Sequence, residues 1–408
     1  MAQKRNTRQI ILNEAFNLCY ESPKSLFSLS ELADRVGISK TAIFRHFKNK
    51  DSLLGEMASL IIDGLAEILR KGDYFRDAST HLTEDYDRFR ELITAFVEFF
   101  VSNKGYLGFA LNTKAFLPSP GEFFLKGLMD RGIVFSKEFL ESKTPERFFR
   151  VYFCGETIIY FISRRECLTL AGISEYSSEE EFINSIVDLL WNGVAKNRPD
   201  IADERIAELD KICEIDISTF PKDTRFFTAF AQTFQDSGFE GITVERISEK
   251  LNLAKSSLYA FYENKDEFIT KMLIEEFSMI MKTLMEKTKH AESVQELAYI
   301  LLRAEKNYLK ERPFVLTIHY WASQKGFNTY RTKDDRIGFN EHRFAYLEEK
   351  NIELKDSLTL QSFVGWASSL VGALKFFFEM TPLKEIEHIT DYAQELYNLI
   401  VNGIEGQE

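Results

Sequence analysis

One stretch of this chain occurs twice, and the spacing between its two copies is constant. Residues 28–54 match residues 243–269 at an offset of 215 without a gap. A shorter match at an offset of 210 joins Asn192-Gly193 to Asn402-Gly403 near the ends of the two halves. Self-similarity at a fixed spacing indicates a duplicated structural unit. The 408 residues are therefore expected to fold as two similar halves.

The repeated stretch has the pattern of two short helices joined by a tight turn. Apolar residues follow Leu29 at intervals of three, four and seven, which is one face of a helix. Ser28 and Glu31 form the capping box that starts such a helix. Gly37 tolerates the left-handed backbone that ends one, and the second copy has Asn252 there. The pattern predicts a helix-turn-helix in each half.

The second helix of this motif is expected to turn Ile43 and Phe47 inward and to expose basic, hydroxyl and aromatic side chains. Such a set suits a helix in the major groove of DNA. Asn49 is expected to cap the next helix, where Lys50 and the helix N-terminus would bind a phosphate. The candidate DNA contacts in the first copy are Ser28, Ser39, Lys40, Thr41, Ala42, Phe44, Arg45, His46, Lys48 and Lys50. Those in the second copy are Thr243, Lys255, Ser256, Ser257, Tyr259 and Lys265.

Residues 7–57 resemble the DNA-binding region of the TetR family of repressors. The family pattern T-x-x-x-I-A-x-x-x-G-V-S-x-x-x-x-Y-x-H-F-x-x-K-x-x-L is met by Ser28, Leu32, Ala33, Gly37, Ile38, Ser39, Phe44, His46, Phe47, Lys50 and Leu53. Residues 222–272 resemble it less closely. The departures there are Ser248 for Ala, Asn252 for Gly, Ala254 for Ser and Phe261 for His.

The resemblance implies an all-α fold of two tandem TetR-like units, each a three-helix DNA-binding domain followed by a helical ligand-binding and dimerisation domain. The expected domains are residues 1–57 and 58–197, a linker at 198–220, a partly degenerate helix-turn-helix domain at 221–272, and 273–408. The bundle-forming helices would be 145–169 with 178–196, and 355–380 with 386–404. A family dimer needs two subunits, so an intrachain pseudo-dimer is expected, with a homodimer as the alternative.

The regulatory parts are rich in aromatic residues, since Phe alone accounts for 37 of the 408 residues. Apolar pockets between helices are where small hydrophobic ligands bind. The candidate lining residues are Phe96, Phe99, Tyr106, Phe109 and Phe116 in the first half, and Phe314, Tyr320, Trp321, Phe344 and Trp366 in the second. At each of these positions, ordinary core packing is the competing interpretation.

Charge distinguishes the two helix-turn-helix regions. The whole chain has a net charge of -12, but residues 1–57 hold nine Lys/Arg against six Asp/Glu. Residues 222–272 hold seven against eight, so the second region should attract phosphate less strongly. Because the two recognition helices also differ, we expect an asymmetric operator.

The sequence thus predicts a ligand-responsive DNA-binding regulator, most simply a repressor. The alternative is a ligand-sensing or adaptor protein that keeps the fold with one or both DNA-reading units inactive.

Other classes of protein are disfavoured by the motifs that the sequence lacks. It has no Gly-rich phosphate loop, no GxSxG and no CxxC or HExxH spacing, so we expect no enzyme, cofactor or metal site. Four scattered cysteines are typical of a reducing cytoplasm. No apolar run reaches the ~18 residues that a transmembrane helix needs, so no membrane partner is expected. The expected partners are double-stranded DNA and a small hydrophobic effector.

Overall fold

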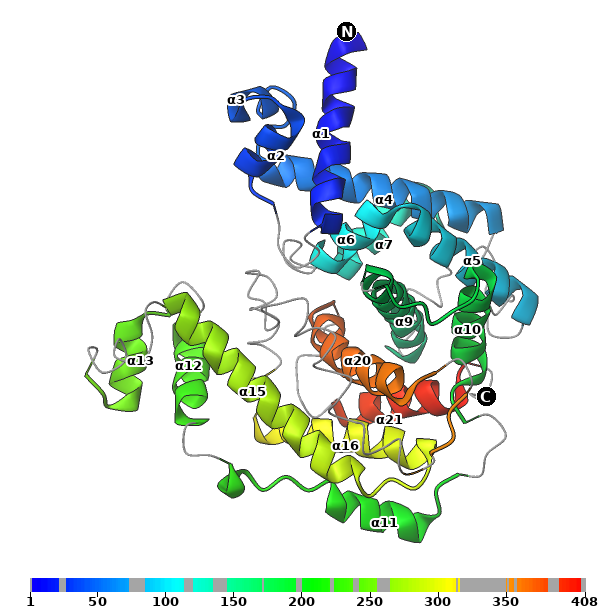
Figure 1. Ribbon diagram of the computed structural model, residues 1–408, viewed down its shortest axis with the longest axis vertical. Coiled ribbons are helices and arrows are strands. Elements are labelled where there is room, and N and C mark those ends of the chain that lie inside the picture. Colours follow the sequence, from blue (N-terminus) through cyan, green and yellow to red (C-terminus); the bar gives the residue numbers. More distant parts are fainter. Residues whose placement is uncertain are drawn as a thin grey trace.

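The computed structural model describes residues 2–21, 27–72, 85–113, 120–134, 145–170, 172–195, 200–220, 224–237, 242–254, 265–312, 315, 350, 352–355, 358–380 and 389–404. All regular structure in these ranges is helical, without a strand, as the resemblance implied. The helices form two halves that meet along helices from the end of each (Figure 1).

In its described residues, the first half holds nine helices. They are α1 (Ala2–Glu21), α2 (Leu29–Val36), α3 (Lys40–Ile43), α4 (Lys50–Gly72), α5 (Tyr86–Ser102), α6 (Lys104–Thr113), α7 (Pro120–Asp130), α9 (Pro145–Leu170) and α10 (Glu179–Asn192). The second half repeats this order in its described part with α12 (Thr224–Ser237), α13 (Val244–Leu251), α15 (Lys265–Thr288), α16 (Val294–Glu311), α20 (Leu360–Met380) and α21 (Ile389–Asn402). Between the halves lie α11 (Asp203–Ile212) and the short 3₁₀ turn η1 (Ile217–Thr219).

The motif helices begin and end where their sequence indicates. Ser28 and Glu31 form the capping box at the start of α2, and Gly37 ends that helix with φ at 73°. Asn252 ends α13 in the same left-handed conformation, with φ at 52°. An Asn accepts this conformation at lower cost than most residues with a side chain. The second helix of the first motif is shorter than expected, because α3 ends at Ile43 and a turn continues to His46.

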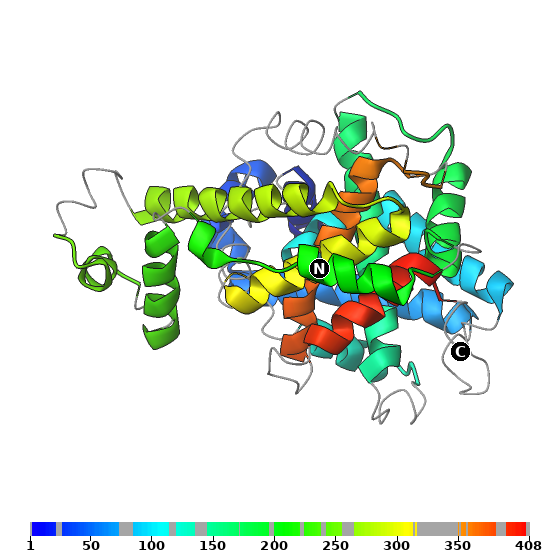
Figure 2. The same cartoon turned by 90° about the horizontal axis from the view of Figure 1, so that it is seen from below.

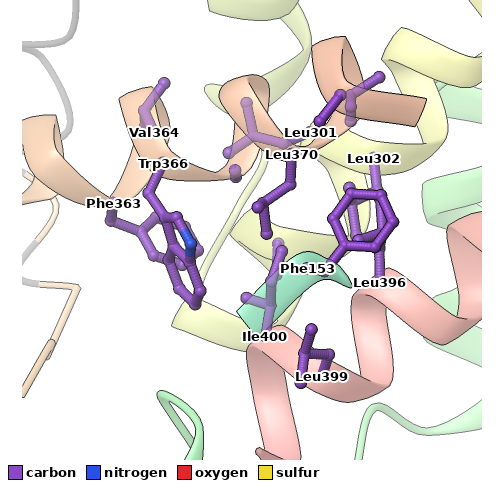
Figure 3. Packing of buried hydrophobic residues seen from close by; sticks show 14 of the residues in the cluster. Phe153, Leu301, Leu302, Phe363, Val364, Trp366, Leu370, Leu396, Leu399 and Ile400 are labelled. Carbon is purple, nitrogen blue, oxygen red and sulfur yellow. The ribbon is translucent and has the colours of Figure 1, made fainter. Parts of the chain in front are cut away.

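The two halves share a hydrophobic core where α9 packs against α20 and α10 against α21. In Figure 3, side chains from both halves converge there: Phe153 of α9, Leu301 and Leu302 of α16, Phe363, Val364, Trp366 and Leu370 of α20, and Leu396, Leu399 and Ile400 of α21. The Trp366 indole donates to the Thr157 hydroxyl across this contact, at 3.0 Å. A buried indole N–H needs such an acceptor, which fixes how α20 lies on α9.

Main-chain hydrogen bonds also join the halves, just after α10 and α21. The Val194 amide donates to the Ile400 carbonyl, and the Ile404 amide donates to the Leu190 carbonyl, both at 2.9 Å. Gly193 and Gly403 both have positive φ, and a Cβ on either would clash with main-chain atoms of the opposite half. Only glycine permits so close an approach. The repeated Asn-Gly pairs therefore mark a nearly symmetric crossing of the two halves.

The linker packs closely on the second half. α11 lies along α16, with Leu209 and Cys213 fully buried, in line with its amphipathic sequence. Asp210 accepts hydrogen bonds from Tyr299 at 2.7 Å and from Arg303 at 2.8 Å. The connection between the halves is thus a docked helix.

The two DNA-binding regions attach to their regulatory domains differently. α1 packs tightly on α6, where a Cβ on Gly105 would lie 2.7 Å from the Phe16 Cβ, and one on Gly108 would overlap the Cys19 main chain. By contrast, α12 and α13 lie at the outer end of the long α15 in both views (Figures 1 and 2).

Candidate nucleic-acid interface

The first helix-turn-helix is held by its caps and by two inward side chains. The Ser39 hydroxyl accepts from the Ala42 amide at 3.2 Å and starts α3. Ile43 and Phe47 are buried in a core shared with α1, α2 and α4. The α2–α3 turn is closed by the Ile38 amide, which donates to the Ala33 carbonyl at 3.0 Å. The recognition segment, residues 39–48, is therefore fixed on its inner side.

The outer side of the recognition segment is open to solvent. Lys40, Thr41, Arg45 and Lys48 are exposed, and Phe44 exposes 45% of its surface although it is a large apolar residue. Ser28 and Ser39 are also exposed, whereas Ala42 and His46 are partly covered. Cations beside a hydroxyl and an exposed aromatic ring can contact phosphates, base edges and a thymine methyl.

Lys50 is more enclosed than its predicted phosphate contact suggests. Its ammonium donates to the Phe27 carbonyl at 2.6 Å and lies 5.3 Å from the centre of the Phe27 ring. Burial lowers the pKa of Lys50 from its usual value. Asn49 caps α4 by accepting from the Ser52 amide at 2.8 Å, as expected. A phosphate at this helix start remains a prediction, in which Lys50 would use its other N–H donors.

Less of the second recognition region can be placed. Thr243 caps α13 by accepting from the Arg246 amide at 3.3 Å, and Lys265 begins α15. The predicted contacts Lys255, Ser256, Ser257 and Tyr259 lie outside the described residues.

Sequence analysis missed Arg8, which lies near the recognition segment in space but not in the chain. Its guanidinium donates to the His46 carbonyl and to both carboxylate oxygens of Glu56. Arg8 precedes the repeated stretch, and no local pattern connects it to His46. Only the folded arrangement of α1, α3 and α4 brings these groups together.

The predicted effector-lining residues fall into four groups. Phe96 and Phe99 are partly buried beside the main core. Tyr106 and Phe109 instead pack on Phe16 of α1, with ring centres 4.6 and 5.8 Å away. Trp366 is buried between α20 and α9, so it fills the contact between the halves. The remaining candidates, Phe116, Phe314, Tyr320, Trp321 and Phe344, lie outside the described residues.

Two other kinds of site are absent from the described part of the chain. No group of three or more His, Cys, Asp or Glu side chains there is arranged to hold a metal ion. No helix in that part combines the length and hydrophobicity needed to cross a membrane.

Comparison with known families agrees with this geometry. The family model described as "Bacterial regulatory proteins, tetR family" matches residues 11–57 and again residues 228–272. These ranges include the helix-turn-helix of each half. The chain thus carries two copies of a TetR-type helix-turn-helix region in tandem. Outside the matched ranges, the likeness of the two halves to each other rests on the repeated order of their helices.

One curated relative is an "Uncharacterized HTH-type transcriptional regulator" from Haemophilus influenzae (strain ATCC 51907 / DSM 11121 / KW20 / Rd). It is 35% identical over 94 residues, which is 22% of this chain and 46% of the relative. The match thus spans about half the length of that relative. Both findings are similarities to transcriptional regulators: the family model to those of the TetR family, and the relative to one of the helix-turn-helix type.

Proposed function

We propose that this chain is a ligand-responsive repressor of transcription that binds double-stranded DNA mainly through its first TetR-type unit. The observation that carries the proposal is the recognition segment. Ile43 and Phe47 anchor its inner side, while Lys40, Phe44 and Arg45 remain exposed on its outer side. A protein that acts on DNA in this way would work in the cytoplasm.

A single chain would supply both halves of the TetR-type dimer. The packing of α9 on α20 and α10 on α21, with the Trp366–Thr157 hydrogen bond, supports such a pseudo-dimer. Light scattering of the full chain should then give a mass near 47.4 kDa. Twice that mass would favour a homodimer.

The operator would be asymmetric. Symmetric dimers bind palindromes because their recognition helices are identical. Here Arg45 and His46 correspond to Ala260 and Phe261 at the offset of 215. The first unit would therefore supply most of the sequence discrimination.

An effector would act through the regulatory helices of either half. Phe96 and Phe99 remain the candidate contacts in the first half, and Phe116 is a further candidate outside the described residues. A small hydrophobic ligand that prefers one spacing of the two recognition regions would shift the population and release DNA.

Selection of bound fragments from random double-stranded DNA by the full chain tests the proposal. The selected site should lack inverted-repeat symmetry, and its affinity should fall steeply with salt. Lys40→Ala should weaken binding by roughly 5- to 150-fold, the range for a contact worth about 1–3 kcal/mol. The matched change Lys255→Ala in the second unit should weaken it by less than about threefold.

Equal effects of the two lysine changes, or a clean inverted repeat, would contradict the asymmetric operator. A chain that selects no sequence would instead support the alternative of a ligand-sensing adaptor that has kept the fold.

A further inference from the structure

Arg8 makes contacts in three directions from α1. Its Nε donates to Glu56 Oε1 on α4 at 2.9 Å, and Nη2 pairs with the other oxygen of the same carboxylate. Its Nη1 donates to the main-chain carbonyl of His46. The guanidinium also lies 4.3 Å from the centre of the Phe47 ring. One side chain thus joins α1, α4 and the end of the recognition segment.

The recognition segment needs such a contact because it is too short to hold its own shape. α3 has four residues, and the turn after it is held by hydrogen bonds from the His46 and Phe47 amides to the Ile43 carbonyl. Isolated helical turns are unstable in water. The last carbonyls of a helix also lack intrahelical partners, and a cation with N–H donors satisfies them well.

The exposure of the Arg8–Glu56 pair argues that its main effect is not on stability. The two side chains remain 40% and 30% exposed. Ion pairs this accessible to water contribute only about 0–1 kcal/mol to folding. The bond to the His46 carbonyl, by contrast, fixes where the recognition segment ends and where α4 begins.

We propose that Arg8 is a positioning residue for DNA recognition, which holds the His46 carbonyl and the Phe47 ring so that the recognition segment and the start of α4 face one stretch of DNA. The proposal rests on the proposed function. Arg8 itself contacts neither bases nor phosphates in this arrangement. It lowers the cost of ordering the surface that does.

The second unit has the opposite charges at the matching positions. At the offset of 215, Arg8 corresponds to Asp223 and Glu56 corresponds to Lys271. An aspartate carboxylate accepts hydrogen bonds and cannot donate one to a main-chain carbonyl. Lys271 pairs instead with Glu267 on its own helix, at 2.9 Å. The residue types at these two positions therefore cannot supply the same contact in the second unit.

Three variants of the full chain test the role of Arg8. Arg8→Gln removes the charge and the contact. The double change Arg8→Asp with Glu56→Lys copies the residue types of the second unit, and so allows an ion pair but leaves no donor at position 8 for the His46 carbonyl. Arg35→Gln is the control, because Arg35 is equally exposed in the same unit and also binds carboxylates, at Glu14 and Glu21.

Affinity is measured for the tightest fragment selected from random DNA, at several salt concentrations, beside the melting temperature. Arg8→Gln should weaken binding roughly tenfold, or about 1.4 kcal/mol, with the salt slope and the melting temperature almost unchanged. The double variant should stay weak, and Arg35→Gln should bind as the unmodified chain does. A salt slope reduced by about one would mean that Arg8 contacts a phosphate directly, and would overturn the proposal. So would full affinity in either Arg8 variant.

Hydrogen exchange of residues 40–50 tests the same role without DNA. Arg8→Gln should speed exchange there at least several-fold at an unchanged melting temperature, whereas Arg35→Gln should not. Unchanged exchange would overturn the positioning role. If the unmodified chain selects no DNA, the proposed function fails, but the exchange experiment still decides whether Arg8 orders the segment.

Discussion

The helix pair α4–α5 in the first half and the pair α15–α16 in the second hold equivalent places, but different chemistry joins them. At the offset of 215 that aligns the starts of α4 and α15, buried Ile61 corresponds to Glu276. The N-caps Asp85 and Ser293 align α5 with α16, which pairs Phe100 with Tyr308. Two positions that hold buried apolar residues in the first half thus hold members of a buried polar network in the second.

This network is well satisfied. Glu276 is 1% exposed and accepts from the Tyr308 hydroxyl at 2.7 Å. Arg312 donates to both of its carboxylate oxygens, each at 2.6 Å, and also lies over the Phe227 ring of α12. A buried charge is tolerated when it is paired and fully hydrogen-bonded. The comparison teaches that one helical scaffold accepts either apolar residues or a paired charge at these positions.

The largest expected effect breaks the network from one side. Glu276→Gln should destabilise the second half by about 3–5 kcal/mol, because it leaves the Arg312 charge buried without a counter-charge. Urea unfolding of the full chain would measure this loss in the transition that includes α15 and α16.

A triple variant tests whether the network can be replaced. Glu276→Ile and Tyr308→Phe introduce the residues of the first half, and Arg312→Leu removes the charge that they would leave without a counter-charge. Together the three changes should recover most of the lost stability. If the triple variant is as unstable as Glu276→Gln, the two solutions are not interchangeable.

The next effect concerns how the first unit is attached. Gly108→Ala places a Cβ against the Cys19 main chain of α1, and should cost up to about 3 kcal/mol. The control is Gly55→Ala in α4, where no atom lies within 4 Å of the added Cβ. That change should be neutral or stabilising by up to ~1 kcal/mol. Similar urea midpoints for both variants would show that α1 and α6 can move apart freely.

The smallest effect comes from Glu305, a second carboxyl in this half, of which one buried oxygen has no hydrogen-bond partner. Glu305 on α16 corresponds to buried Val97 on α5, and its Oε2 has no hydrogen-bond partner. Burial raises the pKa of Glu305 to about 8, well above its usual value. The folded protein therefore holds a proton that the unfolded chain releases near pH 4.5. Stability should fall as the pH rises from about 4.5 to 8.

Glu305→Val should remove that dependence and gain on the order of 1–2 kcal/mol at pH 8, but less at pH 5. Urea unfolding at the two pH values measures the difference, with the neutral Glu305→Gln as the matched control. Parallel pH profiles for the original and Val chains would mean that the carboxyl is solvated or paired in solution.

The parts of this structure that were predictable depend on neighbours in the chain. Ser28, Gly37 and Asn252 act within a few residues of themselves, so capping and turn rules located both motifs. The duplication revealed the two halves because it is a property of the sequence alone.

The parts that were not predictable depend on distant contacts. Lys50 looked like a free phosphate ligand, but its bond to the Phe27 carbonyl arises only when α4 packs against the start of α2. Trp366 was predicted to line a pocket, but the packing of α9 on α20 covers its side chain. Arg8 lies outside every local pattern, and its bond to His46 exists only after α1 folds back over the motif.

The crossing at Gly193 and Gly403 bears on how such a chain avoids assembling wrongly. Because the two glycine turns are nearly alike, the turn of each half is suited to pair with a copy of the same half as well as with the other half. Separately expressed halves would therefore be free to form like-with-like dimers. A covalent linker gives the other half of the same chain an effective concentration on the order of millimolar. Pairing within one chain then outcompetes pairing with halves of other chains at cellular concentrations. Covalent fusion would thus favour the pairing of the two halves of one chain, and would leave each half free to change its chemistry alone.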